Sequence, residues 1–250
     1  MTALLEARGV CKRFGAVVAA ADITLAIGRG ERVSLIGSNG AGKTTLVNMI
    51  TGYLKPDAGT ISFDGRDVTA LAPRAITRLG VARSFQIPQL YGDLTVLDNV
   101  LVANACHDQR LSLRLPAHRP EAIERAEALL ERFGLAEQRE RRVAGLPGGV
   151  RKLLDIAMAL TGAPRLLLLD EPTSGVSAEE KFALMDTVMT ALGQEAMTVL
   201  FVEHDMEIVA RYAGRVVAFY AGRVIADDTP DAALAGDDVR RYVTGELLVE

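Results

Sequence analysis

Short apolar runs separated by turn residues dominate the first third of the chain. The runs VVAAADITLAI (17–27), GRGERVSLIG (28–37) and GTISFDG (59–65) contain the β-branched residues and bounding glycines typical of strands. Between the second and third runs, TTLVNMITGYL (44–54) has the apolar spacing of a helix. This pattern predicts a sheet with one early crossover helix.

From Pro88 to Leu160 the apolar positions follow the period of a helix. The segment PEAIERAEALLERFGL (120–135) shows this most clearly, because its apolar side chains fall on one helical face. These side chains are Ala122, Ala126, Leu129, Leu130 and Phe133. We therefore predict a helical insertion over 88–160.

After the insertion the pattern returns to strands. The predicted strands are 166–170, 197–204, 215–220 and 222–227, with a helix at 181–192 between the first two. The chain, 1–250, is predicted to be a single domain with 1–87 and 161–235 as its core, 88–160 as its helical part and 236–250 as a C-terminal tail. We expect the tail to be a terminal helix packed on the core, and a contact for a partner is the alternative.

Composition and charge narrow the class of protein. A chain of 250 residues, 49% of them hydrophobic, is long enough to bury a full core. A net charge of −4 supplies no basic excess for a polyanion, so we expect no nucleic-acid partner. We expect no signal peptide, and no apolar run approaches the ~18 to 20 residues that span a bilayer. Cys11 and Cys106 are predicted to be free thiols in a reducing compartment.

Candidate chemistry begins at GSNGAGKT (37–44), which follows an apolar strand and precedes a helical pattern. The spacing fits G-x-x-x-x-G-K-[ST], a loop whose glycines turn successive backbone N–H groups toward phosphates. Lys43 would reach the β- and γ-phosphate oxygens, and Thr44 would bind Mg²⁺. The predicted nucleotide-binding residues are Gly37, Ser38, Asn39, Gly40, Ala41, Gly42, Lys43, Thr44 and Thr45. The alternative is an ordinary glycine turn, which the flanking strand and helix disfavour.

Two adjacent carboxylates end the apolar run LLLLDEP (166–172). Asp170 would hold Mg²⁺ through its water shell, and Glu171 would act as the general base on the attacking water. A small-molecule kinase or a GTPase needs the first acid but not the second. Without the loop at 37–44, a simple strand-to-turn exit would be the preferred interpretation of this segment.

Four further fragments occur in order around these two motifs. They are FGAVVAAADITL (14–25), SFQIPQL (84–90), LPGGV (146–150) and VEHD (202–205). Together, the six motifs resemble the ATP-binding subunit of an ABC transporter over nearly the whole chain. The segments at 83–103 and 203–230 resemble the branch that imports branched-chain amino acids, whose paralogues also serve amides, urea and aromatic acids.

This resemblance implies an α/β fold. Its core would be a P-loop NTPase core of mixed sheet and flanking helices. An ABC-type helical subdomain and an antiparallel β portion on the N-terminal side would complete it.

The resemblance also implies roles for three residues outside the first two motifs. Phe14 matches the aromatic residue that stacks on adenine. Gln86 matches the glutamine that touches Mg²⁺ and the attacking water, in a loop bordering the surface where a membrane subunit docks. His204 matches the histidine that hydrogen-bonds the γ-phosphate. The alternatives are a core phenylalanine, a solvated loop glutamine and a structural histidine.

The stretch LPGGV departs from the family signature Leu-Ser-Gly-Gly-Gln, which binds the γ-phosphate held by the other subunit of a dimer. Pro147 replaces the serine and Val150 the glutamine, so that only the backbone N–H groups of Gly148 and Gly149 remain as donors. Ser177 stands where many relatives have aspartate at the dimer interface. We interpret these departures as the sign of an asymmetric heterodimer, and a slow homodimer is the alternative.

The functional prediction is an ATP-binding and ATP-hydrolysing subunit of an importer, bound peripherally at the cytoplasmic face of the membrane, with ATP and Mg²⁺ as cofactors. Expected partners are membrane-spanning permease subunits, a second ATP-binding subunit and, indirectly, a solute-binding protein. Two alternatives stay open: a regulatory nucleotide-binding subunit with little turnover, and a soluble ABC ATPase of DNA repair or translation. The second usually carries a long coiled coil or a tandem ATPase domain, for which 250 residues leave no room.

Overall fold

Two sheets and their flanking helices make up the computed structural model, which describes residues 3–107, 119–193 and 197–245. Within these ranges the strands are β1 (Ala3–Phe14), β2 (Val17–Gly28), β3 (Arg32–Gly37), β4 (Ala58–Phe63), β5 (Arg66–Asp67), β6 (Val81–Ser84), β7 (Leu166–Asp170), β8 (Thr198–Val202), β9 (Arg215–Tyr220) and β10 (Arg223–Asp228). The helices are α1 (Lys43–Ile50), α2 (Pro73–Arg78), α3 (Val96–His107), α4 (Pro120–Arg132), α5 (Gly148–Ala159), α6 (Lys181–Gly193), α7 (Met206–Tyr212), α8 (Pro230–Ala235) and α9 (Asp237–Val239). Short helical turns are η1 (Ala136–Gln138), η2 (Val143–Gly145) and η3 (Arg240–Thr244).

The larger sheet has the strand order β10-β9-β3-β8-β7-β6, in which β10 alone pairs antiparallel. All residues of β7 are buried, as expected for a parallel strand covered on both faces. Leu167 and Leu169 face one hydrophobic cluster, whereas Leu166 and Leu168 face another. The larger sheet therefore separates two cores.

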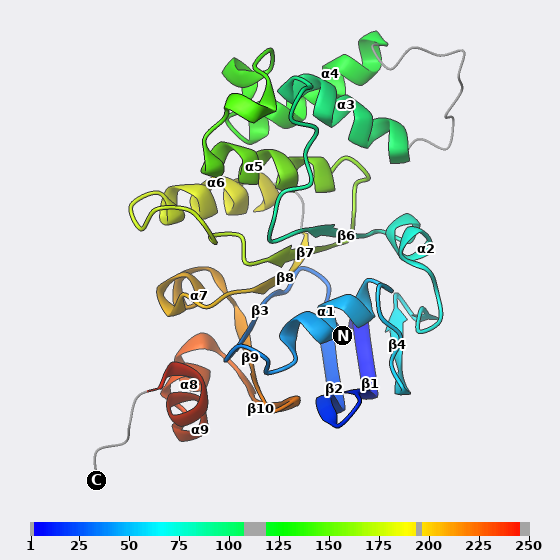
Figure 1. Cartoon of the computed structure of the whole chain (residues 1–250), viewed down its shortest axis with the longest axis vertical. Helices are drawn as coiled ribbons and strands as arrows, with labels where there is room; N and C mark the ends of the chain where they lie inside the picture. Colours follow the sequence, from blue (N-terminus) through cyan, green and yellow to red (C-terminus); the bar gives the residue numbers. More distant parts are fainter. Residues whose placement is uncertain (1–2, 108–118, 194–196, 246–250) are drawn as a thin grey trace.

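Helices α3, α4, α5 and α6 cover one face of this sheet (Figure 1). Of these, α3, α4 and α5 lie in the segment for which helical periodicity was expected. The residues predicted to share one helical face are all buried: Ala122, Ala126, Leu129 and Leu130 in α4, and Phe133 at its C-cap. The amphipathic pattern thus identifies the side of α4 that packs on its neighbours.

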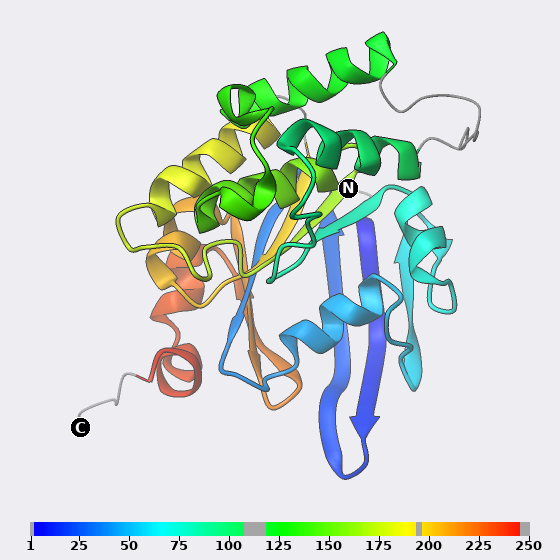
Figure 2. The ribbon, with the colours of Figure 1, turned by 45° about the horizontal axis from the view of Figure 1, so that its top comes forward.

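Helix α1 lies on the opposite face, between the larger sheet and an antiparallel sheet of order β2-β1-β4-β5 (Figure 2). Its apolar residues join one buried cluster with both sheets. The helix ends at Ile50, so the prediction of a helix over 44–54 is wrong at its C-terminal end. Gly52 has a φ of 77°, and a Cβ there would lie 2.7 Å from the carbonyl oxygen of Leu71, because the chain turns sharply at this point.

The C-terminal tail packs on the larger sheet over the residues that are described. Val239 of α9 is buried beside Ile36 and Val216. In η3, the ring of Tyr242 stacks on Tyr220 with 4.3 Å between the ring centroids. Packing of the tail on the core is therefore confirmed for 237–244, in the form of two short helical segments. The end of the predicted tail, 246–250, lies outside the described residues.

Three further observations bear on function. Among the described helices, none is long and apolar enough to cross a membrane. Cys11 and Cys106 form no disulfide bond in the structure. Among the residues that the structure describes, no group of three or more His, Cys, Asp or Glu side chains is arranged to hold a metal ion.

Candidate functional site

The loops that carry the predicted site residues meet at one edge of the larger sheet. Strands β3, β8, β7 and β6 are neighbours and run parallel, so their carboxyl ends face the same side. Gly37 ends β3, Gln86 follows β6, Glu171 follows β7 and His204 follows β8. Ligands of open parallel α/β sheets bind beyond this edge.

The loop after β3, residues 38–42, requires glycine at two places. Gly37 and Gly42 have φ values of 149° and 109°. A Cβ at these positions would lie 2.4 Å from the carbonyl oxygen of Phe219 and 2.3 Å from that of Ala19, respectively. The loop is thus wedged between β9 and β2. The exposed residues at its tip are Ser38, Asn39 and Gly40.

Helix α1 begins at Lys43, so that its first N–H groups and its dipole face the loop. Lys43 is almost fully buried, and its ammonium donates to the carbonyls of Gly37 at 2.6 Å and Ser38 at 3.1 Å. Burial lowers the pKa of Lys43, and the nearby charges of Glu171 and Asp170 oppose that shift. The positive charge is therefore held inside the loop, next to the two predicted acids. Beside it, Ala41 is buried, Thr44 exposed and Thr45 half-buried.

The carboxylate of Glu171 lies between two other predicted site residues. Gln86 Nε2 donates to Glu171 Oε2 at 2.6 Å, and His204 Nε2 lies 3.0 Å from Glu171 Oε1. With Nε2 protonated, the imidazole donates to this oxygen. The structure therefore brings together three side chains that follow three different strands.

Glu171 adopts a left-handed backbone conformation, with a φ of 47°. Such a conformation costs about 1–3 kcal/mol outside glycine and persists only where the surroundings fix it. Here the N–H of Glu171 donates to Val202 O at 3.0 Å, and its carbonyl accepts from Ser174 N–H at 3.1 Å. This turn directs the side chain out of the buried strand β7 toward His204.

His204 is placed by the start of the next helix. The adjacent Asp205 caps α7, because its side chain accepts hydrogen bonds from the N–H groups of Glu207 and Ile208. Asp205 also pairs with Lys181 at the start of α6. The backbone next to His204 is therefore fixed by two helices.

Asp170 has a partner that the sequence reasoning missed. Arg83 Nη2 donates to Asp170 Oδ2 at 2.5 Å, and neither side chain is more than 9% exposed. Arg83 Nη1 also donates to Asn48 Oδ1 at 2.7 Å. The signal available in the sequence is Arg83 itself, since an arginine in a buried strand needs a carboxylate partner from a neighbouring element.

Helix α5 holds the backbone on both sides of Gln86, and this too was missed. Lys152 Nζ donates to the carbonyls of Phe85 at 3.2 Å and Gln86 at 2.7 Å. Asp155 accepts from the N–H groups of Phe85 at 3.3 Å and Gln89 at 3.0 Å. Burial raises the pKa of Asp155 and lowers the pKa of Lys152. The signal was a charged pair three residues apart on the apolar face of a helix.

Phe14 lies at the turn between β1 and β2, where it pairs with Val17. Its surface is 50% exposed, so the alternative of a core phenylalanine is wrong. Further along β2, the carbonyl of Ala19 packs closely against Gly42. The exposed ring therefore lies at the end of β1, beside β2, the strand that borders the phosphate loop.

Helix α5 begins at Gly148, with Pro147 in the N-cap position and no side-chain cap. Proline has no N–H group, but the N–H group at the N-cap makes no hydrogen bond within the helix. Pro147 therefore does not disturb the helix. Pro147 and Gly148 are exposed, and Gly149 is half-buried. Since α5 and α1 pack on opposite faces of the larger sheet, the two predicted phosphate-binding helix starts belong to different layers (Figure 1).

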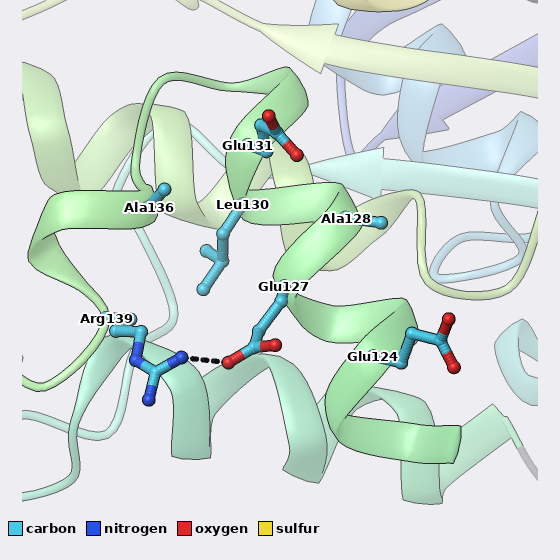
Figure 3. Close-up of a pocket in the computed structure, with 7 residues that line it drawn as sticks. All are labelled: Glu124, Glu127, Ala128, Leu130, Glu131, Ala136 and Arg139. Carbon is cyan, nitrogen blue, oxygen red and sulfur yellow. Dashed lines mark hydrogen bonds and ion pairs between the residues drawn. The ribbon is translucent and has the colours of Figure 1, made fainter. Parts of the chain in front are cut away.

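A separate hollow of about 410 Å³ lies against α4 and η1 (Figure 3). It is lined by Glu124, Glu127, Ala128, Leu130, Glu131, Ala136 and Arg139. Arg139 pairs with Glu127. The carboxylates at this hollow repel phosphate groups, so it does not suit a nucleotide.

Comparisons with known proteins place the chain in a family. A family model described as ABC transporter matches residues 20–174. The Salmonella typhimurium protein named high-affinity branched-chain amino acid transport ATP-binding protein LivG is 37% identical, over 97% of this chain and 98% of its own length. The Pseudomonas aeruginosa protein of the same description, BraF, is 35% identical over 97% and 98% of the two chains.

Solved structures are similar over nearly the whole chain. An ATP-binding cassette of an ABC transporter in its ADP conformation has a TM-score of 0.85 and 29% identity, covering 96% of this chain and 98% of the other. A nucleotide-free cassette from an ABC transporter has a TM-score of 0.81 and 28% identity, with 98% and 96% covered. The predicted α/β fold class is thereby confirmed.

Proposed function

Since the chain belongs to the ABC transporter family, we propose that it is the ATP-hydrolysing subunit of an importer for branched-chain amino acids or a related small polar or aromatic solute. ATP binding and ATP hydrolysis accompany membership of the family. The solute class is supported by relatives named for branched-chain amino acid transport.

One observation carries the hydrolytic role: the carboxylate of Glu171, beside the phosphate loop, is held by Gln86 and His204. A carboxylate fixed in this way is poised to accept a proton from water. In this proposal Gln86 orients that water and His204 contacts the γ-phosphate, where negative charge develops. Lys43 supplies a positive charge to the β- and γ-phosphates.

The rest of the nucleotide would be held by groups already described. Residues 37–45 surround the phosphates with backbone N–H groups, and the exposed ring of Phe14 stacks on adenine. We assign these contacts to ATP because β2 links the two parts: its Ala19 borders the phosphate loop at Gly42, and its Val17 pairs with Phe14.

The donor set suits Mg²⁺. Hard oxygen ligands are available from the hydroxyl of Thr44, the carboxylate of Asp170 and the amide oxygen of Gln86. Mg²⁺ is usually bound by one or two such groups together with substrate phosphates. Asp170 Oδ2 is engaged by Arg83, so we propose that Asp170 acts on the ion through water. Bound Mg²⁺ would neutralise charge on the phosphates.

We further propose a dimer with a second ATP-binding subunit, in which Gly148 and Gly149 bind the γ-phosphate held by the partner. The accessible start of α5, in a different layer from α1, supports this assignment.

Permease subunits would dock near the loop of Gln86 at the cytoplasmic face of the membrane, and a solute-binding protein would act indirectly. Residues 88–160 would form the helical subdomain, 1–87 and 161–235 the core.

Uptake of labelled leucine tests the solute class. In cells that lack the gene for this chain, we expect leucine uptake to fall severalfold, and to be restored by the wild-type chain but not by Lys43→Ala. Labelled urea and phenylalanine, taken up in parallel, distinguish the related solutes. Unchanged uptake of all three solutes in the deleted cells would contradict the proposed importer.

Pro147→Ser tests the assignment of α5 to the partner's nucleotide. The serine hydroxyl adds one hydrogen bond to a charged phosphate, an interaction of about 1.5–3 kcal/mol, and should raise hydrolysis in the partner's site by roughly tenfold or more. The rate is measured in a dimer whose copy of this chain also carries Glu171→Gln, so that turnover at the partner's site alone is observed.

Pro147→Ala is the matched control, because it removes the ring without adding a donor. A rate that rises equally in both variants would attribute the effect to the lost ring. An unchanged rate with serine would contradict the assignment of Gly148 and Gly149.

A further inference from the structure

The residues proposed to carry the chemistry lie just beyond the last paired positions of their strands. The parallel ladder between β7 and β8 ends where Asp170 pairs with Val202. Glu171 and His204 follow these positions. The backbone of Glu171 is strained, with its φ of 47°. Contacts outside the ladder must therefore set how the two side chains meet.

Glu203 supplies such contacts. It is only 3% exposed and follows β8 directly. One carboxylate oxygen, Oε1, accepts from Thr173 N–H at 3.1 Å and from Thr173 Oγ1 at 2.7 Å. The other, Oε2, accepts from His204 N–H at 3.1 Å. A single buried carboxylate thus joins the segment that follows Glu171 to the backbone of His204.

The backbone of Glu203 adds a third connection. Its N–H donates to Leu35 O on β3 at 3.3 Å, so this residue also touches the strand that leads into the phosphate loop. Lys152 lies within electrostatic reach of the carboxylates of Glu203, Asp170 and Glu171. The buried negative charge therefore has both hydrogen-bond donors and a nearby cation, as a buried ion requires.

We propose that Glu203 is a positioning residue for ATP hydrolysis, whose carboxylate ties Thr173 to the backbone of His204 and thereby holds Glu171 and His204 in contact. It does not reach the reacting atoms itself, since both of its oxygens are engaged by Thr173 and His204. This inference rests on the proposed role of Glu171 as the general base.

The geometry explains why a carboxylate is needed. Three donors converge on the two oxygens of Glu203, and two of them are backbone N–H groups that cannot turn into acceptors. A glutamine in this place would always direct its own NH₂ group at one of the two backbone donors. Glu203→Gln should therefore release either Thr173 or His204 while keeping the side-chain volume.

Glu203→Gln is expected to lower kcat by roughly ten- to a hundredfold, because a shift of about 1 Å at a reacting group has an effect of this size. The affinity for MgATP, measured by titration, should stay at the wild-type value, since the phosphate loop has its own supports. Added to Glu171→Gln, the change should cause a smaller loss in the residual single-turnover rate than it causes in the wild-type chain, because groups that act as a unit are not additive.

Asp186→Asn is the matched control. Asp186 also accepts from several donors, those of Arg211 and Tyr212, but on the outer side of α6 and α7. Its loss should leave kcat at the wild-type value. If Glu203→Gln fails to fold, Thr173→Val removes one donor alone and should lower kcat by roughly fivefold with MgATP affinity unchanged.

The outcomes separate this inference from the function on which it rests. Normal turnover in Glu171→Gln would overturn the proposed base. If Glu171→Gln loses turnover while Glu203→Gln keeps the wild-type kcat, only the positioning role is overturned. A wild-type kcat in Thr173→Val has the same meaning where that variant replaces Glu203→Gln. An equally large fall when Glu203→Gln is added to Glu171→Gln, as expected for an independent effect, would also overturn the positioning role.

Discussion

Glu171→Gln should lower the steady-state ATPase rate by about 100-fold or more, with the affinity for MgATP within about threefold of wild type. Glutamine has the same shape, and its amide oxygen can still accept one of the bonds from Gln86 and His204. It cannot take a proton from water, so the chemical step is lost while binding survives. The rate is measured by phosphate release and the affinity by titration with MgATP.

Glu124→Gln serves as the control for this change. Glu124 lies on α4 at the hollow shown in Figure 3. Its substitution makes the same chemical replacement away from the phosphate loop and should leave the rate unaltered. Turnover at the wild-type level in Glu171→Gln would remove Glu171 from its proposed role.

Lys43→Ala should weaken MgATP binding by roughly 100-fold and abolish measurable turnover at millimolar ATP. A hydrogen bond to a charged group contributes about 1.5–3 kcal/mol, and Lys43 is proposed to contact two phosphates. In the described structure its ammonium donates to the carbonyls of Gly37 and Ser38, so the side chain is already held within the loop that the phosphates would enter. Titration calorimetry with MgATP measures the affinity.

The variant also removes a buried positive charge, so its stability needs a check. Thermal unfolding without nucleotide should show that Lys43→Ala remains folded, and Lys55→Ala, on the exposed chain after α1, should bind MgATP like the wild type. MgATP affinity equal to wild type in folded Lys43→Ala would exclude the loop at 37–44 as the phosphate site.

Local sequence patterns predicted the parts of this molecule where one element carries its own signal. The GSNGAGKT loop lies where its glycines allow the close approach to β9 and β2, and LLLLD is buried on both faces because all of its residues are apolar up to the acid. The buried face of α4 follows from its helical period. In each case the physical cause lies within a few neighbouring residues.

Elements without such a signal were missed. In β1, register shifts near Gly9 interrupt the alternation of buried and exposed residues, so the period of a strand is hidden. Helices α2 and α7 are too short to show a helical period. The turn at Gly52, which ends α1 early, depends on the distant Leu71.

The supports of the site were missed for a related reason. Four charged residues bind groups that lie far away in the sequence: Arg83, Lys152, Asp155 and Glu203. In the sequence, each of them looks like an ordinary polar residue. What makes them recognisable is that they are charged and almost buried. Burial is a property of the folded chain, and in the sequence only the position of these charges within apolar segments points to it.

ATP hydrolysis by the purified chain, alone and with the second ATP-binding subunit of its transporter, tests the proposed catalytic role of Glu171 most sharply, with Glu171→Gln as the blank. We expect MgATP-dependent phosphate release in at least one of these conditions, and its loss in the blank. Release by the chain alone would mean that two copies close on each other, and release only with the second subunit would mean an asymmetric dimer. Tight MgATP binding without hydrolysis in either condition would contradict the proposed role of the chain as an ATP-hydrolysing subunit.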